Sequence, residues 1–255
     1  MVGAALFFLL SASALAQNPI HPVFEGHTPL PNGSNALVFG YYNSGRSPIE
    51  IPSGAAIEIR GTGGGATLNG QQLSRIFNLH AGAQLILRNV HLVNGSADKG
   101  GCVKIDGVGV GTGFTMFGGS ISDCHATGNG GGIYALGSTI SRDSEDGNGI
   151  FLQRTEIARC TAGGEGSGVF TRTHFLWLYD VRIIDCSAVG VGGGISLHNL
   201  WSGYARNLTI ARCVSGLGAG GLAIAGGVAR VAVRGCGNGD RGRIAAAERG
   251  LRHDG

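Results

Sequence analysis

The sequence predicts an all-β protein, a single-stranded right-handed parallel β-helix of about seven coils. A Cys or Asn recurs eight residues before a small residue that an aliphatic residue follows, in units that start 26 to 36 residues apart. Glycine occupies 49 of the 255 positions, which favours a fold with many tight turns. Short runs of alternating aliphatic residues predict strands, and no segment shows a helical period. A constant offset inside units of variable length is typical of a solenoid whose loops absorb insertions.

The N-terminal segment resembles a secretory signal peptide. Met1–Ala16 contains an apolar run that ends in Ala14-Leu15-Ala16, the small-x-small form of a cleavage site. Because no basic residue precedes the apolar run, an uncleaved anchor or a different start codon is the alternative. No later stretch approaches the ~20 apolar residues that cross a bilayer. We therefore expect a secreted or cell-surface protein, with residues 17–47 forming an irregular, proline-containing cap on the solenoid.

The solenoid is expected over residues 48–240, with two strand signals in each repeat. One follows the small position, as in Ile133 with Ala135, and the other precedes the cysteine, as in Val181 with Ile183. The longest insertions, Gly107–Gly113 and Gly137–Gly149, are the places where loops could carry a site. Residues 241–255 are expected to form a polar tail.

The repeat places one residue of each unit in a common structural column. Its predicted members are Asn94, Cys124, Cys160, Cys186, Cys213 and Cys236. Stacked coils put such residues about 4.8 Å apart, which lies within the Cα range of a disulfide, but parallel side chains would strain the bond. We therefore predict mostly free, buried thiols, with disulfide pairing as the alternative.

The residues just before the cysteines alternate in charge. They are Asp123, Arg159, Asp185 and Arg212. Coils one strand spacing apart would turn this alternation into a ladder of opposite charges along the solenoid axis. The ladder gives these carboxylates a structural role that does not require catalysis.

The motifs Ile121-Ser-Asp-Cys124 with Gly131-Gly132-Ile133, and Ile183-Ile-Asp-Cys186 with Gly193-Gly194-Ile195, resemble the repeats of polymorphic outer-membrane proteins and adhesin-type β-helix proteins. The segment Gly82–Val90 looks like an entry coil of pectin-lyase-like proteins. The resemblance covers roughly residues 48–236 and implies a parallel β-helix. Ile stands where those repeats have Phe, and Cys mostly replaces Asn. Because a fold does not define a reaction, the resemblance leaves the function open.

We predict a non-catalytic protein with a structural, adhesin-like or carbohydrate-binding role. The alternative is a polysaccharide-active enzyme resembling a pectate lyase or polygalacturonase. The Asn-Thr-Asp, Asp-Asp and Gly-His-Gly strings of polygalacturonases are missing from the sequence. An enzyme would have to use Asp180 with Asp185, or Asp123 with Arg154. No catalytic or cofactor-binding residue is predicted. No metal site is predicted either, because the acidic loop 143–148 and the histidines lack metal-ligand spacing.

Surface features bear on the partners. Phe175, Trp177 and Tyr179 alternate along one strand and share a face, with Trp201 and Tyr204 one coil later. We expect that face to point inward or to be shielded, because it carries more apolar area than Leu176 and Leu178. If it points outward, it would form a stacking platform for sugar rings or a protein partner.

An extracellular polysaccharide or protein is the expected partner. Nucleic acid is not expected, because the net charge is only +3 and the arginines are scattered. Asn32 and Asn207 lie in glycosylation sequons. Asn94-Gly-Ser96 matches the same pattern but is expected to be buried by its place in the column.

Overall fold

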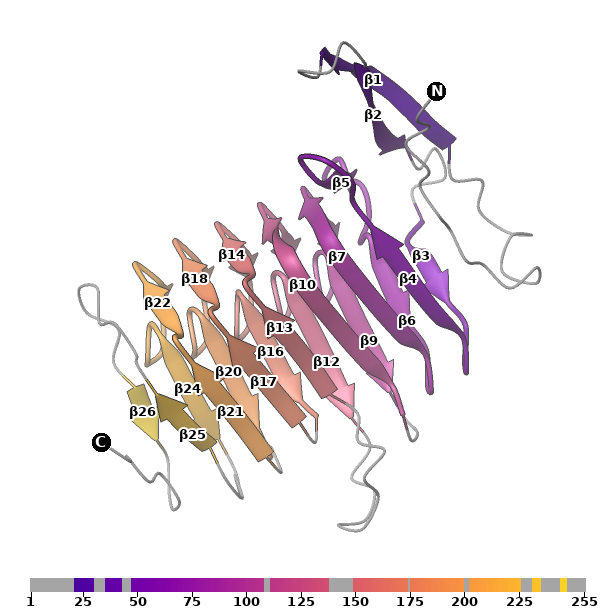
Figure 1. Cartoon of the computed structure of the whole chain (residues 1–255). Helices are drawn as coiled ribbons and strands as arrows, with labels where there is room; N and C mark the ends of the chain where they lie inside the picture. Colours follow the sequence, from indigo (N-terminus) through magenta and orange to yellow (C-terminus); the bar gives the residue numbers. More distant parts are fainter. Residues whose placement is uncertain are drawn as a thin grey trace.

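The structure, a computed structural model, is an all-β parallel solenoid of about six turns, where the sequence predicted about seven. It describes residues 21–29, 35–42, 47–107, 111–137, 149–173, 175–199, 202–225, 231–234 and 244–246. The coils stack from the indigo N-terminal end to the yellow C-terminal end (Figure 1). The described residues form strands and turns without a helix. This part of the chain therefore contains no membrane-spanning helix.

The largest sheet has 13 strands and forms two adjoining faces of the solenoid. We call the face built by the first strand of each coil the front face. Its strands are β4 (Ala56–Arg60), the first parts of β7 (Gln84–Val93) and β10 (Gly113–Ser122), β13 (Gly149–Gln153), β17 (Phe175–Tyr179), β21 (Ser202–Arg206) and β25 (Val231–Arg234). The adjoining face contains β5 (Ala66–Asn69), the later parts of β7 and β10, β14 (Glu156–Ala158), β18 (Arg182–Ile184) and β22 (Thr209–Ala211).

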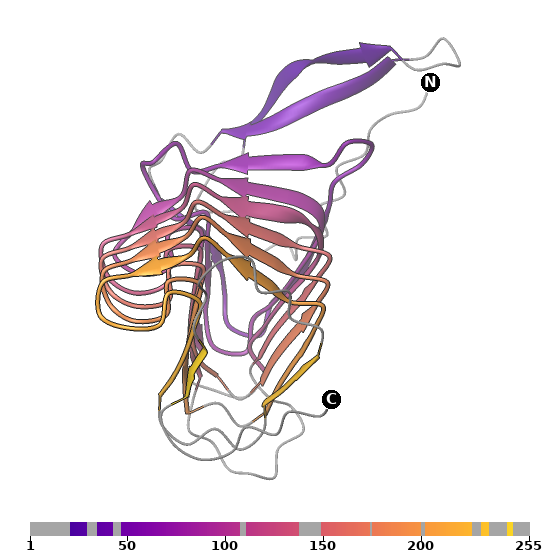
Figure 2. The same cartoon turned by 90° about the vertical axis from the view of Figure 1, so that its left-hand side faces the viewer.

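Two further sheets complete each coil. The five-stranded sheet has two-residue strands, β8 (Ser96–Ala97), β11 (His125–Ala126), β15 (Thr161–Ala162), β19 (Ser187–Ala188) and β23 (Val214–Ser215). The eight-stranded sheet contains β3 (Ile49–Ile51), β6 (Phe77–Leu79), β9 (Val103–Gly107), β12 (Ile133–Gly137), β16 (Val169–Arg172), β20 (Ile195–His198), β24 (Leu222–Ala225) and β26 (Ile244–Ala246). The five-stranded sheet and the glycine-rich turns after it bulge outward as a side lobe (Figure 2).

The core consists of columns of apolar side chains that follow the parallel register. Val103, Ile133 and Val169 occupy equivalent positions in β9, β12 and β16, and each is fully buried. Each coil thus packs its inward side chains onto identical positions of the coils above and below, which is how a solenoid buries apolar area that one coil alone could not bury.

The chain turns between strands through residues in the left-handed backbone region. One column of such corners holds Asn89, Arg154, Asp180 and Asn207, and the next holds Asn94, Asp123, Arg159, Asp185 and Arg212, all with φ between 51° and 56°. Asn and Asp tolerate this conformation better than most residues do. The arginines at the same corners show that the stack imposes the geometry on whichever residue stands there.

Both ends of the solenoid differ from the prediction. The expected irregular cap contains an antiparallel hairpin of β1 (His21–Pro29) and β2 (Asn35–Tyr42). The pairing of Tyr41 with Leu68 of β5 joins this hairpin to the large sheet. At the other end, Ile244 of β26 pairs with Leu222, so the strands extend past the boundary expected at residue 240.

The cysteine column holds for four of its six predicted members. Cys124, Cys160, Cys186 and Cys213 are equivalent, because the residue after each of them pairs along the five-stranded sheet. Asn94 was wrongly placed, since Val93 pairs with Ser122 and Ser96 pairs with His125. Gly95 therefore aligns with Cys124, and Asn94 aligns with Asp123. The side-lobe turn of that coil is one residue shorter, so the eight-residue offset points to the wrong neighbour. Cys236 lies outside the described residues.

One predicted thiol is oxidised. Cys124 forms a disulfide with Cys102, with a Cα–Cα distance of 5.6 Å, while Cys160, Cys186 and Cys213 are free and buried. Cys102 stands where the next coil has Gly132, because Val103 pairs with Ile133. The prediction considered only bonds between neighbours in the column and missed this diagonal pair.

Candidate functional site

The front face carries a cluster of aromatic side chains, which we call the aromatic face. Its members are Phe117, Phe151, Phe175, Trp177, Tyr179 and Tyr204, all half-buried. The expectation that Phe175, Trp177 and Tyr179 point inward was wrong, because Leu176 and Leu178 of the same strand are only 4% and 1% exposed. These leucines are in register with Ile150 and Leu152 of the preceding coil. The register with the preceding coil therefore decides which face of the strand is inward, and the larger apolar area of the aromatic rings does not.

The rings form a continuous contact chain across four coils. Ring centroids are 5.5 Å apart between Phe117 and Phe151, 5.5 Å between Phe151 and Tyr179, and 5.3 Å between Tyr179 and Tyr204. Phe175 and Trp177 stack on each other with centroids 4.9 Å apart and planes within 7°. Contacts at these distances stabilise aromatic pairs and limit side-chain motion. The face is therefore a preorganised, largely apolar platform that runs along the solenoid axis.

Charged side chains close the N-terminal end of the aromatic face. The guanidinium carbon of Arg88 lies 4.2 Å from the ring centroid of Phe117. Arg88 Nε also donates a 2.6 Å hydrogen bond to Glu58 Oε1, which accepts a second one from Arg60. These hydrogen bonds, that of Arg88 first, hold the pKa of Glu58 below its ordinary value. Phe117 is therefore covered by a cation, whereas no other described residue places a cation over the rings of the face farther along the axis.

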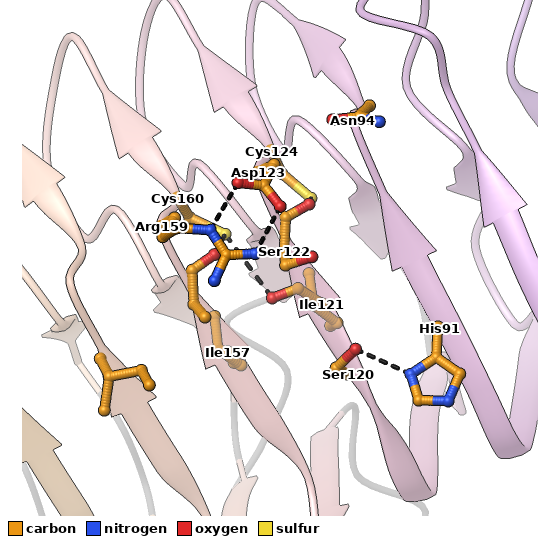
Figure 3. A network of polar contacts seen from close by, with 12 residues as sticks. His91, Asn94, Ser120, Ile121, Ser122, Asp123, Cys124, Ile157, Arg159 and Cys160 are labelled. Atoms are coloured by element: carbon orange, nitrogen blue, oxygen red, sulfur yellow. Dashed lines mark hydrogen bonds and ion pairs between the residues drawn. The ribbon is translucent and has the colours of Figure 1, made fainter.

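The carboxylates considered for catalysis are engaged at the corners. Arg159 donates two hydrogen bonds of 2.7 Å to the two oxygens of Asp123, as Figure 3 shows. Arg212 binds Asp185 in the same bidentate way at 2.6 and 2.7 Å. The predicted ladder thus takes the form of two discrete pairs. Asp180 accepts a 2.7 Å hydrogen bond from Asn207 and is separated from Asp185 by the whole of β18.

The arginines affect the titration of their partners. The hydrogen bond from Arg159 holds the pKa of Asp123 below its ordinary value, and Arg212 does the same for Asp185. Both carboxylates therefore stay ionised, with their oxygens occupied by guanidinium groups. Such a carboxylate can form an ion pair between two coils. A carboxyl that acts as a general acid would instead have a raised pKa.

A second polar cluster lies between the side lobe and the eight-stranded sheet. Glu165 Oε2 is 2.6 Å from His198 Nε2 and 3.1 Å from Ser196 Oγ, and Ser196 is fully buried. Serine and carboxylate both contact the same ring nitrogen of His198. A serine–histidine–acid relay requires the two nitrogens to have different partners. This cluster therefore attaches the lobe to the sheet and lacks the geometry of that relay.

Other polar positions do not assemble into a site. Among the described residues, no group of three or more His, Cys, Asp or Glu side chains could hold a metal ion. Asn207 is exposed at its corner, as a glycosylated residue would have to be. Asn94 is half-buried, and its amide donates to Asn69 Oδ1 over 3.2 Å. Asn32, Trp201 and the acidic loop 143–148 lie outside the described residues.

Two members of the aromatic face, Phe117 and Phe151, were not predicted from the sequence. A signal for both was present in the spacing. Phe151, Trp177 and Tyr204 each stand nine residues before a column cysteine, and Phe117 and Tyr179 stand seven before one. Positions nine and seven before the cysteine belong to one strand and point the same way. Counting back from the cysteines would therefore have joined all five residues into one outward face.

The fold defines this protein as a parallel β-solenoid, consistent with a β-helix repeat protein. No protein-family model, curated protein or solved structure matches the chain. The class therefore rests on the strand register, the stacked core and the repeated corners.

Proposed function

We propose that this protein is a non-catalytic glycan-binding protein that presents the aromatic face to an extracellular polysaccharide. The observation that carries the proposal is the contact chain from Phe151 through Tyr179 to Tyr204, with Trp177 on the same side of the sheet. Sugar rings have apolar C–H faces that pack on aromatic rings in the way that other apolar groups do. A rigid platform lowers the entropic cost of binding, because its side chains are already ordered.

The arrangement of the acidic groups supports binding over turnover. Glycoside hydrolysis needs two carboxyl groups about 5–9.5 Å apart across the scissile bond. Asp123 and Asp185 are each held by an arginine, and Glu58 lies between Arg60 and Arg88. Each of these carboxylates forms an ion pair with a neighbouring arginine, which occupies oxygens that a substrate would otherwise contact.

The test is affinity electrophoresis of the folded protein through gels that contain soluble polysaccharides, compared with the Trp177→Ala variant. We expect at least one polysaccharide to retard the protein. Trp177→Ala should weaken the affinity for that polysaccharide about tenfold or more, since an indole that a ligand covers contributes at least ~1.4 kcal/mol to binding. Leu217→Ala is the matched control, because Leu217 is an apolar side chain that is 76% exposed on the side lobe.

Two results would contradict the proposal. One is binding that the Trp177 and Leu217 variants weaken equally, because the aromatic face would then have no special part in it. The other is release of reducing ends or unsaturated products that disappears in Asp180→Ala or Asp185→Ala, which would favour the polysaccharide-active enzyme.

A further inference from the structure

Unpaired cations flank the open part of the aromatic face. Most arginines of the described residues bind a carboxylate, and these are Arg60, Arg75, Arg88, Arg159, Arg182 and Arg212. Arg154, Arg172 and Arg206 make no ion pair or side-chain hydrogen bond with any other described residue. Two of these three arginines, Arg154 and Arg206, are backbone neighbours of Tyr179 in the adjacent coils.

The strand register fixes how the two arginines lie around that ring. Arg206 of β21 pairs with Tyr179 of β17, so it lies one coil farther along the stack. Arg154 lies one coil earlier, and its backbone N–H donates a 2.8 Å hydrogen bond to the carbonyl of Tyr179. The Cα atoms of Arg154 and Arg206 are therefore two strand spacings apart, roughly 10 Å. Both side chains are exposed, and each is long enough to reach a ligand that rests on Tyr179.

The charge balance of this region is positive. Asp180, the carboxylate next to Arg154 in the register, is held by Asn207, and Glu58 is shared by Arg60 and Arg88. Arg182 of the adjoining face is paired with Glu156. Among the described residues, the aromatic face is thus flanked by four arginines (Arg60, Arg88, Arg154 and Arg206) and two carboxylates (Glu58 and Asp180), and Arg154 and Arg206 are at its open end.

We infer that the aromatic face binds a glycan that carries anionic substituents, with Arg154 and Arg206 as the residues that determine this preference. The inference rests on the proposed glycan-binding function. Guanidinium groups present several N–H donors in a planar fork that matches the two or three oxygens of a carboxylate or a sulfate. Both substituents share this chemistry, so the rings would position the sugar and the arginines would select its charge.

The experiment compares three polymers with one backbone, hydroxyethylcellulose, carboxymethylcellulose and cellulose sulfate, by affinity electrophoresis of the full chain. We expect one or both charged polymers to bind about threefold to tenfold more tightly than the neutral one. The preference should shrink between about 50 mM and about 500 mM salt. The carboxymethyl and sulfate arms show which anion is preferred.

The variants separate this inference from the function on which it rests. Arg154→Gln combined with Arg206→Gln should remove the preference for charge, so that the charged polymers bind about as tightly as the neutral one. Arg172→Gln is the matched control, because Arg172 is equally unpaired but lies on the eight-stranded sheet. An equal loss in Arg172→Gln, or equal binding of all three polymers by the unsubstituted protein, would overturn the role of the two arginines.

A variant of the aromatic face tests the glycan-binding function separately from the charge preference. Trp177→Ala should weaken binding to neutral and charged polymers alike. If it weakens neither while the arginine variants weaken both charged ones, the glycan-stacking function is wrong, and the surface is only a cation patch. Binding to none of the three polymers would overturn both the function and the inference.

Discussion

Along the column, each sulfur lies against a backbone position of the preceding coil, and the residue at that position sets its chemistry. A Cβ atom built on Gly132 would lie 3.3 Å from Cys160 Sγ, and one on Gly194 would lie 3.6 Å from Cys213 Sγ. Glycine at this place therefore leaves room for a free thiol. Cys102 occupies the same place one coil earlier and bonds to Cys124. A single residue type in the neighbouring coil thus decides between thiol and disulfide.

The remaining thiols are expected to be unreactive in the folded protein. The hydrogen bond with Cys160 raises the pKa of the Cys186 thiol, burial acts in the same direction, and the hydrogen bond with Cys213 only partly opposes them. Because the thiolate is the species that alkylates, iodoacetamide at neutral pH should leave Cys186 unlabelled. Cys160 should also stay unlabelled, because it is fully buried. Cys213, 8% exposed, should react first on mild destabilisation. Peptide mapping by mass spectrometry is the measurement, with non-reduced, denatured protein as the fully labelled control. If Cys186 in the folded protein is alkylated as fast as an exposed thiol, the prediction that it is unreactive is wrong.

At the scale of the element, the corners join successive strands of the large sheet. Arg159, after β14, binds Asp123, after β10, and Arg212, after β22, binds Asp185, after β18. Each pair therefore connects two coils on the surface. Exposed pairs of this kind typically contribute about 0.2–1 kcal/mol, so their effect is small beside that of the core columns.

The sign of the pH dependence follows from the lowered pKa of Asp123. A carboxyl whose pKa is lower in the folded than in the unfolded state stabilises the fold above its unfolded value, about 3.9, and loses this effect as pH falls through the folded value. Arg159→Gln should therefore lower the free energy of unfolding by about 0.2–1 kcal/mol at neutral pH and have little effect in strong acid. Urea unfolding at several pH values measures this difference. Arg154→Gln is the control, because Arg154 has a nearly identical φ but no ion-pair partner among the described residues. A difference that grows on acidification would contradict the assignment.

Strand β17 shows where the sequence was sufficient and where it was not. Alternation correctly grouped Phe175, Trp177 and Tyr179 on one face, since that follows from strand geometry alone. Which face points inward depends on the neighbouring coils, where Ile150 and Leu152 already point into the core. Comparing apolar areas within one strand ignores this constraint. The tertiary register, not local hydrophobicity, placed the aromatic face outside.

The ends of the chain show a second limit of sequence reasoning. β1 contains Pro22 and Pro29, which favoured an irregular segment. It nevertheless forms a strand at the edge of the large sheet, where a missing backbone N–H is tolerated because no further strand needs it. The repeat itself was predictable, because the offset between cysteine and glycine reflects a turn of constant length. Asn94 was misplaced where that turn lost a residue.

For the whole molecule, a solenoid couples each coil mainly to its neighbours, so a local change should have a local effect. The Cys102–Cys124 disulfide joins two successive coils across a sequence separation of 22 residues. Loop closure of this length in the unfolded chain corresponds to about 3 kcal/mol. Reduction should therefore loosen the coils around β9 and β12, while those around β20 and β24 keep their protection.

Hydrogen exchange measured peptide by peptide, with and without reductant, tests this prediction, and Cys102→Gly is its matched variant. Glycine at residue 102 reproduces the position that Gly132 occupies in the next coil, so Cys124 gains the environment of the free thiols. This variant should lose the cross-link without creating a steric conflict, and its exchange pattern should match that of the reduced protein. Protection lost uniformly from β9 to β24 would mean that the coils unfold as one cooperative unit. In that case, loss of one coil would spread along the whole stack, and the assumption that each coil depends mainly on its neighbours would be wrong.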